Sequence, residues 1–213
     1  MKQQQLIEYN SQTAVVQLPH FKYVDKVLRS TSFEELFWLF MPSPNPVKEI
    51  SESYAAFSNL KKVCNISNLN WLHIGDGAYA RTAAMFAFFS KSYNTSIDPE
   101  LNYDKLDEWA DKYDVERVAI WKTKFQDSTT TNMYLGPPLN PTGVCLVHSH
   151  VKVEEVDKWH PNWKFMYTNP CCKPSEQMFT EKYMEANGIK LIVDKLDIGI
   201  LSHHRRVLIY KKD

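Results

Sequence analysis

Short hydrophobic runs alternate along most of the chain with longer segments whose hydrophobic residues recur at helical spacing. Short runs closed by polar or turn-forming residues are typical of buried strands, and the longer segments are typical of helices that cover a sheet. The predicted strands are residues 71–74, 94–97, 115–121, 144–150, 163–168, 189–194 and 205–210, with residues 13–18 as a further short strand. The predicted helices are residues 32–40, 46–60, 80–88, 106–113 and 175–187.

The order of these elements predicts the fold class. Strands and helices alternate up to residue 188, which is typical of an open, mostly parallel sheet with helices on both faces. The connection between the last two strands is too short for a crossover helix, so these strands are expected to form an antiparallel hairpin at the end of the sheet. The chain is therefore predicted to be an α/β protein.

Three prolines at positions 42, 44 and 46 interrupt the chain and suggest a boundary. Residues 1–45 are expected to be an N-terminal elaboration, and residues 46–213 the main domain. Aromatic residues cluster in the N-terminal part, which makes it a candidate surface for a protein partner. These residues are Phe33, Phe37, Trp38 and Phe40.

Residues 71–88 contain the strongest ligand-binding signal of the chain. A hydrophobic run enters a turn with Gly75 and Gly77 and continues as an alanine-rich helix. Such a strand–turn–helix unit presents backbone amides and a helix N-terminus to a ligand, and glycine allows the close approach. Asp98 ends the next strand, 21 residues after Gly77, where dinucleotide-type sites hold a ribose diol. The combination favours a nucleotide-containing ligand over a simple tight turn.

Charge and composition narrow the classes of partner. Lys plus Arg and Asp plus Glu each total 25, so the formal net charge is zero. Non-specific nucleic-acid binding usually needs a basic excess and is therefore not favoured. Neither an 18-residue hydrophobic run nor a hydrophobic leader is visible, so we expect no membrane span and a cytoplasmic location. The four cysteines lack a regular spacing and are expected to be reduced thiols.

His148 and His150 are the candidate catalytic residues. They alternate at the end of a predicted strand, so both side chains would project from the same face. A neutral histidine is a natural general base near pH 7, and the alternative is a pair of hydrogen-bonded histidines at a strand end. With Cys171 and Cys172 they form a set of ligand types suited to zinc, but adjacent cysteines rarely bind one tetrahedral ion together. We therefore predict no metal site.

The pattern over residues 46–213 resembles the class I S-adenosylmethionine-dependent methyltransferases, which have a Rossmann-like sheet that ends in an antiparallel hairpin. Residues 73–79 stand where this family has its acid-x-Gly-x-Gly-x-Gly loop. The resemblance implies contacts to the cofactor from the loop, from Asp98 at the ribose and from Asp127 at the adenine. The implied loop residues are His73, Gly75, Asp76, Gly77, Ala78 and Tyr79.

Two positions of the loop depart from the family pattern. His73 replaces the acid that helps to orient the methionine end of the cofactor. Tyr79 replaces the third glycine, and it fits the loop only if that position keeps a negative φ.

The resemblance implies S-adenosylmethionine as cofactor and methyl transfer to an acceptor that enters beside His148 and residues 128–143. The acceptor itself is not indicated by the sequence. One alternative is a non-catalytic protein that keeps the fold and serves as an interaction or structural subunit. A nicotinamide-dependent oxidoreductase would also explain the glycine turn and Asp98, but the terminal antiparallel hairpin argues against it.

Overall fold

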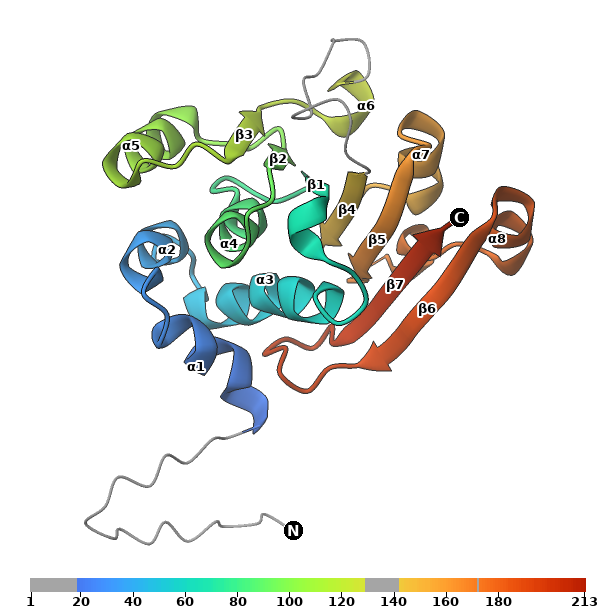
Figure 1. The fold of residues 1–213 in the computed structure, drawn as a ribbon, viewed down its shortest axis with the longest axis horizontal. Coiled ribbons are helices and arrows are strands. Elements are labelled where there is room, and N and C mark those ends of the chain that lie inside the picture. The colour runs from blue at the N-terminus through green and yellow to red at the C-terminus, as the bar shows by residue number, and fades with distance from the viewer. Residues whose placement is uncertain (1–18, 129–141, 172) are drawn as a thin grey trace, which may run out of the picture.

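The computed structural model describes residues 19–128, 142–171 and 173–213. These residues form one seven-stranded sheet in the order β3-β2-β1-β4-β5-β7-β6, which runs from left to right in Figure 1. Among these strands, β7 runs antiparallel to its two neighbours, β5 and β6, and the other neighbouring pairs are parallel. The strands are β1 (Asn70–Ile74), β2 (Asn94–Ile97), β3 (Val118–Trp121), β4 (Thr142–Val147), β5 (Trp163–Asn169), β6 (Ile189–Leu196) and β7 (Arg206–Lys212).

The predicted α/β fold with an open, mostly parallel sheet and a closing antiparallel hairpin is therefore confirmed. All seven strands predicted within the described residues are present, although most have a boundary that differs, in two cases by three residues. β3 begins at Val118 instead of residue 115, and β4 ends at Val147 instead of continuing to His150. The short strand expected at residues 13–18 lies outside the described residues.

Helices cover both faces of the sheet. Side chains alternate between the faces along each strand, so hydrophobic residues on both faces need to be buried. In β1, Trp71 belongs to the core on one face, whereas Leu72 and Ile74 belong to the core on the other. The first face carries α3 (Pro46–Leu60) and α4 (Arg81–Phe89), with α5 (Tyr103–Tyr113) packed beside α4. The second face carries α6 (Phe125–Ser128), α7 (Val153–Trp159) and α8 (Glu181–Asn187).

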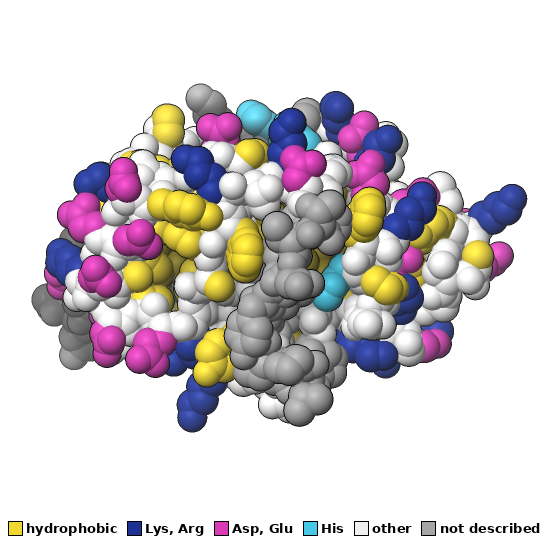
Figure 2. All heavy atoms as spheres, turned by 90° about the horizontal axis from the view of Figure 1, so that it is seen from above, with side chains coloured by type: hydrophobic (Ala, Val, Ile, Leu, Met, Phe, Trp, Pro, Cys, Tyr) yellow, Lys and Arg dark blue, Asp and Glu magenta, His cyan; other side chains and the backbone are white. Residues whose placement is uncertain are grey.

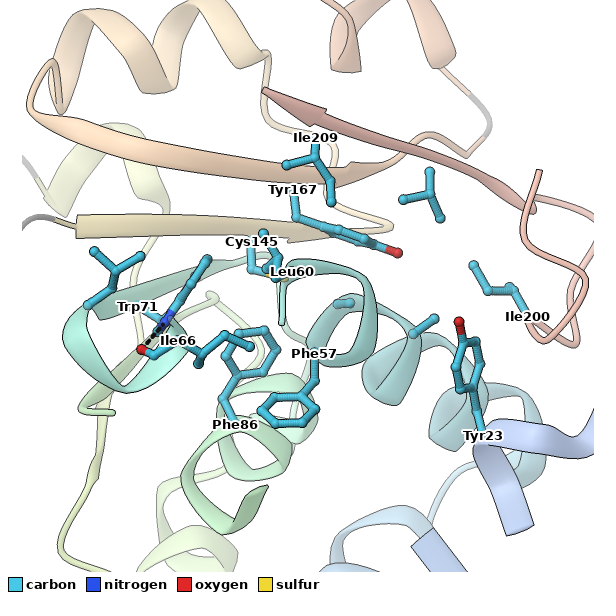
Figure 3. Packing of buried hydrophobic residues seen from close by; sticks show 14 residues of the cluster. Tyr23, Phe57, Leu60, Ile66, Trp71, Phe86, Cys145, Tyr167, Ile200 and Ile209 are labelled. Atoms are coloured by element: carbon cyan, nitrogen blue, oxygen red, sulfur yellow. Dashed lines mark hydrogen bonds between the residues drawn. The ribbon is translucent and has the colours of Figure 1, made fainter. Parts of the chain in front are cut away.

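The first face packs tightly around Trp71 (Figure 3). Its indole Nε1 donates a hydrogen bond of 3.1 Å to the carbonyl of Ile66, and its ring lies 5.2 Å from that of Phe86. A Cβ added to Gly143 on the neighbouring strand would stand 2.4 Å from the indole ring. A side chain at position 143 is therefore incompatible with this packing.

Among the described residues, two α-helices precede α3 and join the same core. α1 (Lys22–Leu28) and α2 (Phe33–Phe40) share a buried cluster with residues of α4 and α5. The described part of the chain also contains short 3₁₀ helices at Pro19–Phe21, Ile66–Asn68 and Pro174–Gln177. The division of the chain at residue 45 stays a prediction.

Four helices differ from the sequence-based expectation. Helices α1, α6 and α7 were not predicted, because each has seven residues or fewer and shows little periodicity. The helix predicted over residues 175–187 is two pieces, since Thr180 begins α8 by accepting a hydrogen bond from the backbone of Tyr183. As expected, α8 ends at Gly188, which has a φ of 65°.

The surface shows mixed charge. On the face seen in Figure 2, acidic and basic side chains are interspersed rather than gathered into a field of one sign. No helix of the described residues has both the length and the hydrophobicity needed to cross a membrane.

Candidate functional site

The glycine turn between β1 and α4 has the conformation that the sequence suggested. Gly75 and Gly77 have φ values of 73° and 71°, which favour glycine. A Cβ on Gly75 would also stand 2.8 Å from the hydroxyl oxygen of Ser149. Tyr79 keeps a negative φ, and the left-handed position falls on Ala80 instead, with a φ of 47°. The tyrosine in place of the third glycine is thus compatible with the turn.

Asp76 caps the N-terminus of α4. Its two carboxylate oxygens accept hydrogen bonds of 2.9 Å from the backbone N–H groups of Thr82 and Ala83. Burial raises the pKa of Asp76 to about 6, although these hydrogen bonds act in the opposite direction. The amides at this helix end are therefore occupied by the chain's own carboxylate and do not form an open anion site.

Asp98 follows β2 and supports the glycine turn from the side. Its Oδ2 accepts a 2.9 Å hydrogen bond from the N–H of Gly77, and its Oδ1 accepts one of 2.7 Å from Glu100. The residue is 8% exposed. Since a carboxylate oxygen has two acceptor positions, each oxygen can also accept a hydrogen bond from a ligand.

Two cavities meet at the turn. Cavity A, of about 370 Å³, lies at the carboxyl ends of β1 and β2. It is lined by Ile74, Gly75, Ile97, Asp98, Pro99, Glu100, Lys124, Phe125, Gln126, His148, Ser149, His150 and Val151. Cavity B, of about 260 Å³, lies between the turn and α3. It is lined by Lys48, Glu49, Ser53, Gly75, Asp76, Gly77, Arg81, Thr82, Val147 and His148.

The two cavities share Gly75 and His148 and differ in chemistry. Cavity A combines the carboxylate of Asp98 with the hydrophobic side chains of Ile97 and Phe125. Cavity B is lined by charged groups of both signs, with Lys48 among them. A ligand that spans both would be aromatic and polar at one end and zwitterionic at the other.

The two candidate histidines are not arranged as the sequence suggested. Because β4 ends at Val147 and His148 has a φ of 52°, the alternation of strand side chains does not apply to them, and the prediction of a shared strand face is wrong. His150 is exposed and His148 is partly buried, yet both line cavity A. Their catalytic role stays a prediction.

Glu52 of α3 is the main feature that the sequence did not reveal. Its carboxylate is 1% exposed, and its Oε1 lies 2.6 Å from Nε2 of His148. Its Oε2 lies 3.2 Å from Nζ of Lys48. Burial would raise the pKa of Glu52, but the contact with His148 and the charges of His148 and Lys48 outweigh it, so the pKa is lowered.

His73 and Ala78 are predicted cofactor contacts that line neither cavity. The His73 ring is 1% exposed, its Nε2 lies 3.1 Å from Oδ1 of Asn94, and it packs against Phe86. Burial lowers the pKa of His73 to about 4, so the ring is neutral at pH 7. The Ala78 carbonyl accepts a hydrogen bond from the backbone of Asn102.

Tyr79 and Asp127 also lie outside the two linings. The Tyr79 ring lies 5.0 Å from the guanidinium of Arg81, which itself lines cavity B. Asp127 is exposed on α6, whereas its helix neighbours Phe125 and Gln126 line cavity A. Asp127 is one or two residues further along α6 than these neighbours. Its side chain therefore points in a different direction from theirs.

The remaining candidates lie partly outside the described residues. Cys172 and residues 129–141 are among those not described. Within the described part of the chain, no group of three or more His, Cys, Asp or Glu side chains is arranged to hold a metal ion.

Many solved structures have a similar fold, but comparisons of the sequence with family models and with curated proteins find no match. No protein-family model matches the sequence, and no curated protein matches it significantly. A mutant of MtNAS in complex with S-adenosylmethionine is 11% identical, with a TM-score of 0.54 over 91% of this chain and 71% of that one. Magnesium protoporphyrin IX methyltransferase (ChlM) from Synechocystis PCC 6803 with bound SAH is 11% identical, with a TM-score of 0.54 over 91% of this chain and 100% of that one.

A third similar structure is the putative methyltransferase yhhF from Escherichia coli. It is 11% identical, with a TM-score of 0.52 over 75% of this chain and 82% of that one. At this level of identity the comparisons concern the fold. The fold of the chain is that of the class I methyltransferases, as its sequence pattern predicted.

Proposed function

We propose that this protein is an S-adenosylmethionine-dependent methyltransferase that holds one cofactor across cavities A and B. The observation that carries the proposal is the position of the glycine turn between two cavities of complementary chemistry. S-adenosylmethionine has an adenine and a ribose diol at one end and an amino acid at the other, with the reactive sulfonium between them. The fold shared with ChlM and MtNAS, whose solved structures contain SAH or S-adenosylmethionine, adds support by analogy.

Cavity A suits the adenosine. Asp98 follows β2 with its Oδ2 bonded to the glycine turn and its Oδ1 bonded to Glu100, and each oxygen keeps an acceptor position for a diol. Ile97, Pro99 and Phe125 supply the hydrophobic walls that an adenine ring requires.

Cavity B suits the amino-acid end. Lys48 and Arg81 offer cationic partners to a carboxylate, and Asp76 offers an anionic partner to an ammonium group. The sulfur and its methyl group would then lie near Gly75 and His148, which the two cavities share. This chain's part in the reaction is to align the acceptor with the methyl group and to exclude water, and alignment alone supplies a large share of the rate enhancement.

Calorimetric titration with S-adenosylmethionine, SAH and NAD tests the proposal. We expect micromolar binding of the first two and no comparable binding of NAD. Asp98→Ala should weaken binding by about tenfold or more, because hydrogen bonds to a charged group contribute about 1.5–3 kcal/mol. Asp104→Ala, at an exposed aspartate on α5, is the matched control and should bind like the wild type.

The same titration distinguishes the proposed enzyme from the non-catalytic alternative. A scaffold that merely keeps the fold would bind none of the three compounds, and Asp98→Ala would change nothing that calorimetry detects. Preference for NAD would instead favour an oxidoreductase. Either result would overturn the proposed function.

A further inference from the structure

A cluster of charged groups joins α3 to the end of β4, directly behind the wall of cavity B. Glu52 does not line the cavity itself, but it contacts Lys48 and His148, which do. His204, on the loop between β6 and β7, lies with its ring 6.1 Å from that of His148. The sulfur of Cys171 lies 3.9 Å from the carbonyl oxygen of His148. Glu52 and His204 therefore face the His148 ring, and Cys171 lies beside its backbone.

The two nitrogens of the His148 ring have different surroundings. Nε2 is fully buried and lies 2.6 Å from Oε1 of Glu52, in a contact that is an ion pair only when the ring is protonated. The side chain as a whole nevertheless keeps 22% exposure and lines both cavities, so the rest of the ring faces them. A proton on Nε2 would face the carboxylate, and this leaves the lone pair of Nδ1 toward the cavities.

The backbone of His148 supports a functional origin of this geometry. A φ of 52° is rare for a residue with a Cβ, and it persists only where the surroundings hold it. The left-handed conformation ends β4 and directs the ring toward α3. An extended residue here would continue the strand instead.

We propose that Glu52 is a positioning residue for His148, and that the pair serves an acceptor whose nucleophilic atom carries a proton, a hydroxyl or an amine N–H. This inference rests on the proposed function. In the reaction, the acceptor's proton moves to Nδ1 of His148 while the lone pair of the acceptor atom forms the bond to the methyl carbon. The bond between methyl and sulfur breaks, and its electron pair remains on sulfur as the sulfonium becomes a thioether. Glu52 stabilises the imidazolium that results.

Nuclear magnetic resonance of the nitrogen-15-labelled histidine rings tests the positioning, and it needs no acceptor. Long-range proton–nitrogen spectra distinguish the two neutral tautomers and the imidazolium. His148 is assigned from the spectrum of a His148→Gln variant. At pH 8 we expect a single neutral state of His148 with its proton on Nε2, and we expect Glu52→Gln to lose this uniform state.

Glu49→Gln is the matched control. It removes the same charge from the same helix, but Glu49 pairs with Lys48 and Arg81 and not with His148. The control should leave the His148 ring as it is in the wild type.

Three results would overturn the proposal. An imidazolium at pH 8 would leave no free base, and a proton on Nδ1 would block the face toward the cavities. An unchanged tautomer in Glu52→Gln would show that another group positions the ring. If Glu52→Gln fails to fold, the wild-type spectrum alone still decides the first two points.

Calorimetry separates failure of this inference from failure of the proposed function. Glu52→Gln should bind SAH within about threefold of the wild type, because the carboxylate lies outside the cavity lining. Loss of SAH binding in the wild type would instead contradict the cofactor proposal, whatever the tautomer of His148.

Discussion

Single residues in this chain show that burial and partners matter more than residue type. Asp98 and His73 both stand at strand ends that a family pattern marks as contacts to a ligand. Asp98 reaches a cavity and the glycine turn, whereas His73 is packed against Phe86, and its Nδ1 has no hydrogen-bond partner among the described residues. A histidine can be buried here because burial keeps it neutral.

Tyr167 gives a prediction at this scale. Its ring is fully buried on β5, and its hydroxyl has no hydrogen-bond partner within the described structure. An unpaired buried hydroxyl carries a desolvation penalty, so Tyr167→Phe should raise the free energy of unfolding by about 1 kcal/mol. Urea denaturation measures this change.

Tyr210→Phe is the control for that experiment. Tyr210 is equally buried, but its hydroxyl bonds to the backbone of Phe179, so its removal should lower the free energy of unfolding. Destabilisation of similar size in both variants would contradict the account of Tyr167.

At the scale of elements, a buried carboxylate ties α1 and α3 to the loop after β6. Asp197 accepts hydrogen bonds from Lys22 at 2.9 Å, from Tyr23 at 2.5 Å and from Asn59 at 2.8 Å. Burial would raise the pKa of Asp197, but these hydrogen bonds outweigh it and hold the pKa well below its usual range. Segments far apart in the sequence are thereby fixed to one another beside the sheet.

Asp197→Asn should therefore lower the free energy of unfolding by about 2–3 kcal/mol, because several hydrogen bonds to a charge are weakened together. Hydrogen exchange should become faster in α1 than in β1, since the helix loses its anchor. Asp194→Asn is the control: its ion pair with Arg206 on the same hairpin is exposed, and the change should cost less than about 1 kcal/mol. Equal effects of the two variants would refute the anchoring role.

The order of elements could be predicted from the sequence because most strands are short hydrophobic runs and each long helix has a regular hydrophobic face, although β2 is largely polar. Helices α1, α6 and α7 were missed because seven residues or fewer give too little periodicity. The end of β4 was placed three residues late, because the positive φ of His148 depends on surroundings far away in the sequence.

The candidate site was predictable only where a local pattern or a fixed spacing in the sequence marks the residues. The glycine turn and Asp98 follow from local pattern and spacing. The Lys48–Glu52 pair has helical spacing, but the contact of Glu52 with His148 joins residues that are 96 positions apart in the chain. Such a contact becomes visible only once α3 lies over the end of β4.

At the scale of the whole molecule, two groups whose pKa values are shifted by burial give the stability opposing dependences on pH. The pKa of Asp76 is raised to about 6, so the folded protein holds this proton more tightly than the unfolded chain, and stability falls as the pH rises from about 4 to 6. The pKa of His73 is lowered to about 4, so the unfolded chain binds this proton more tightly, and stability rises between about pH 4 and 6.5. The two effects offset one another in the wild type.

Asp76→Asn should expose the contribution of His73. The free energy of unfolding of this variant should rise more steeply between pH 4.5 and 6.5 than that of the wild type, as urea denaturation at several pH values would show. Parallel pH profiles of variant and wild type would contradict the burial of an ionisable Asp76.

The central claim is that one cofactor molecule occupies both cavities around the glycine turn. A crystal structure of the protein with SAH tests it most directly. We predict the ribose at Asp98, the adenine beside Phe125, the amino-acid end near Lys48 and Arg81, and the sulfur close to His148. Bound SAH at any other place, or SAH confined to one cavity with the other filled by water, would contradict the claim.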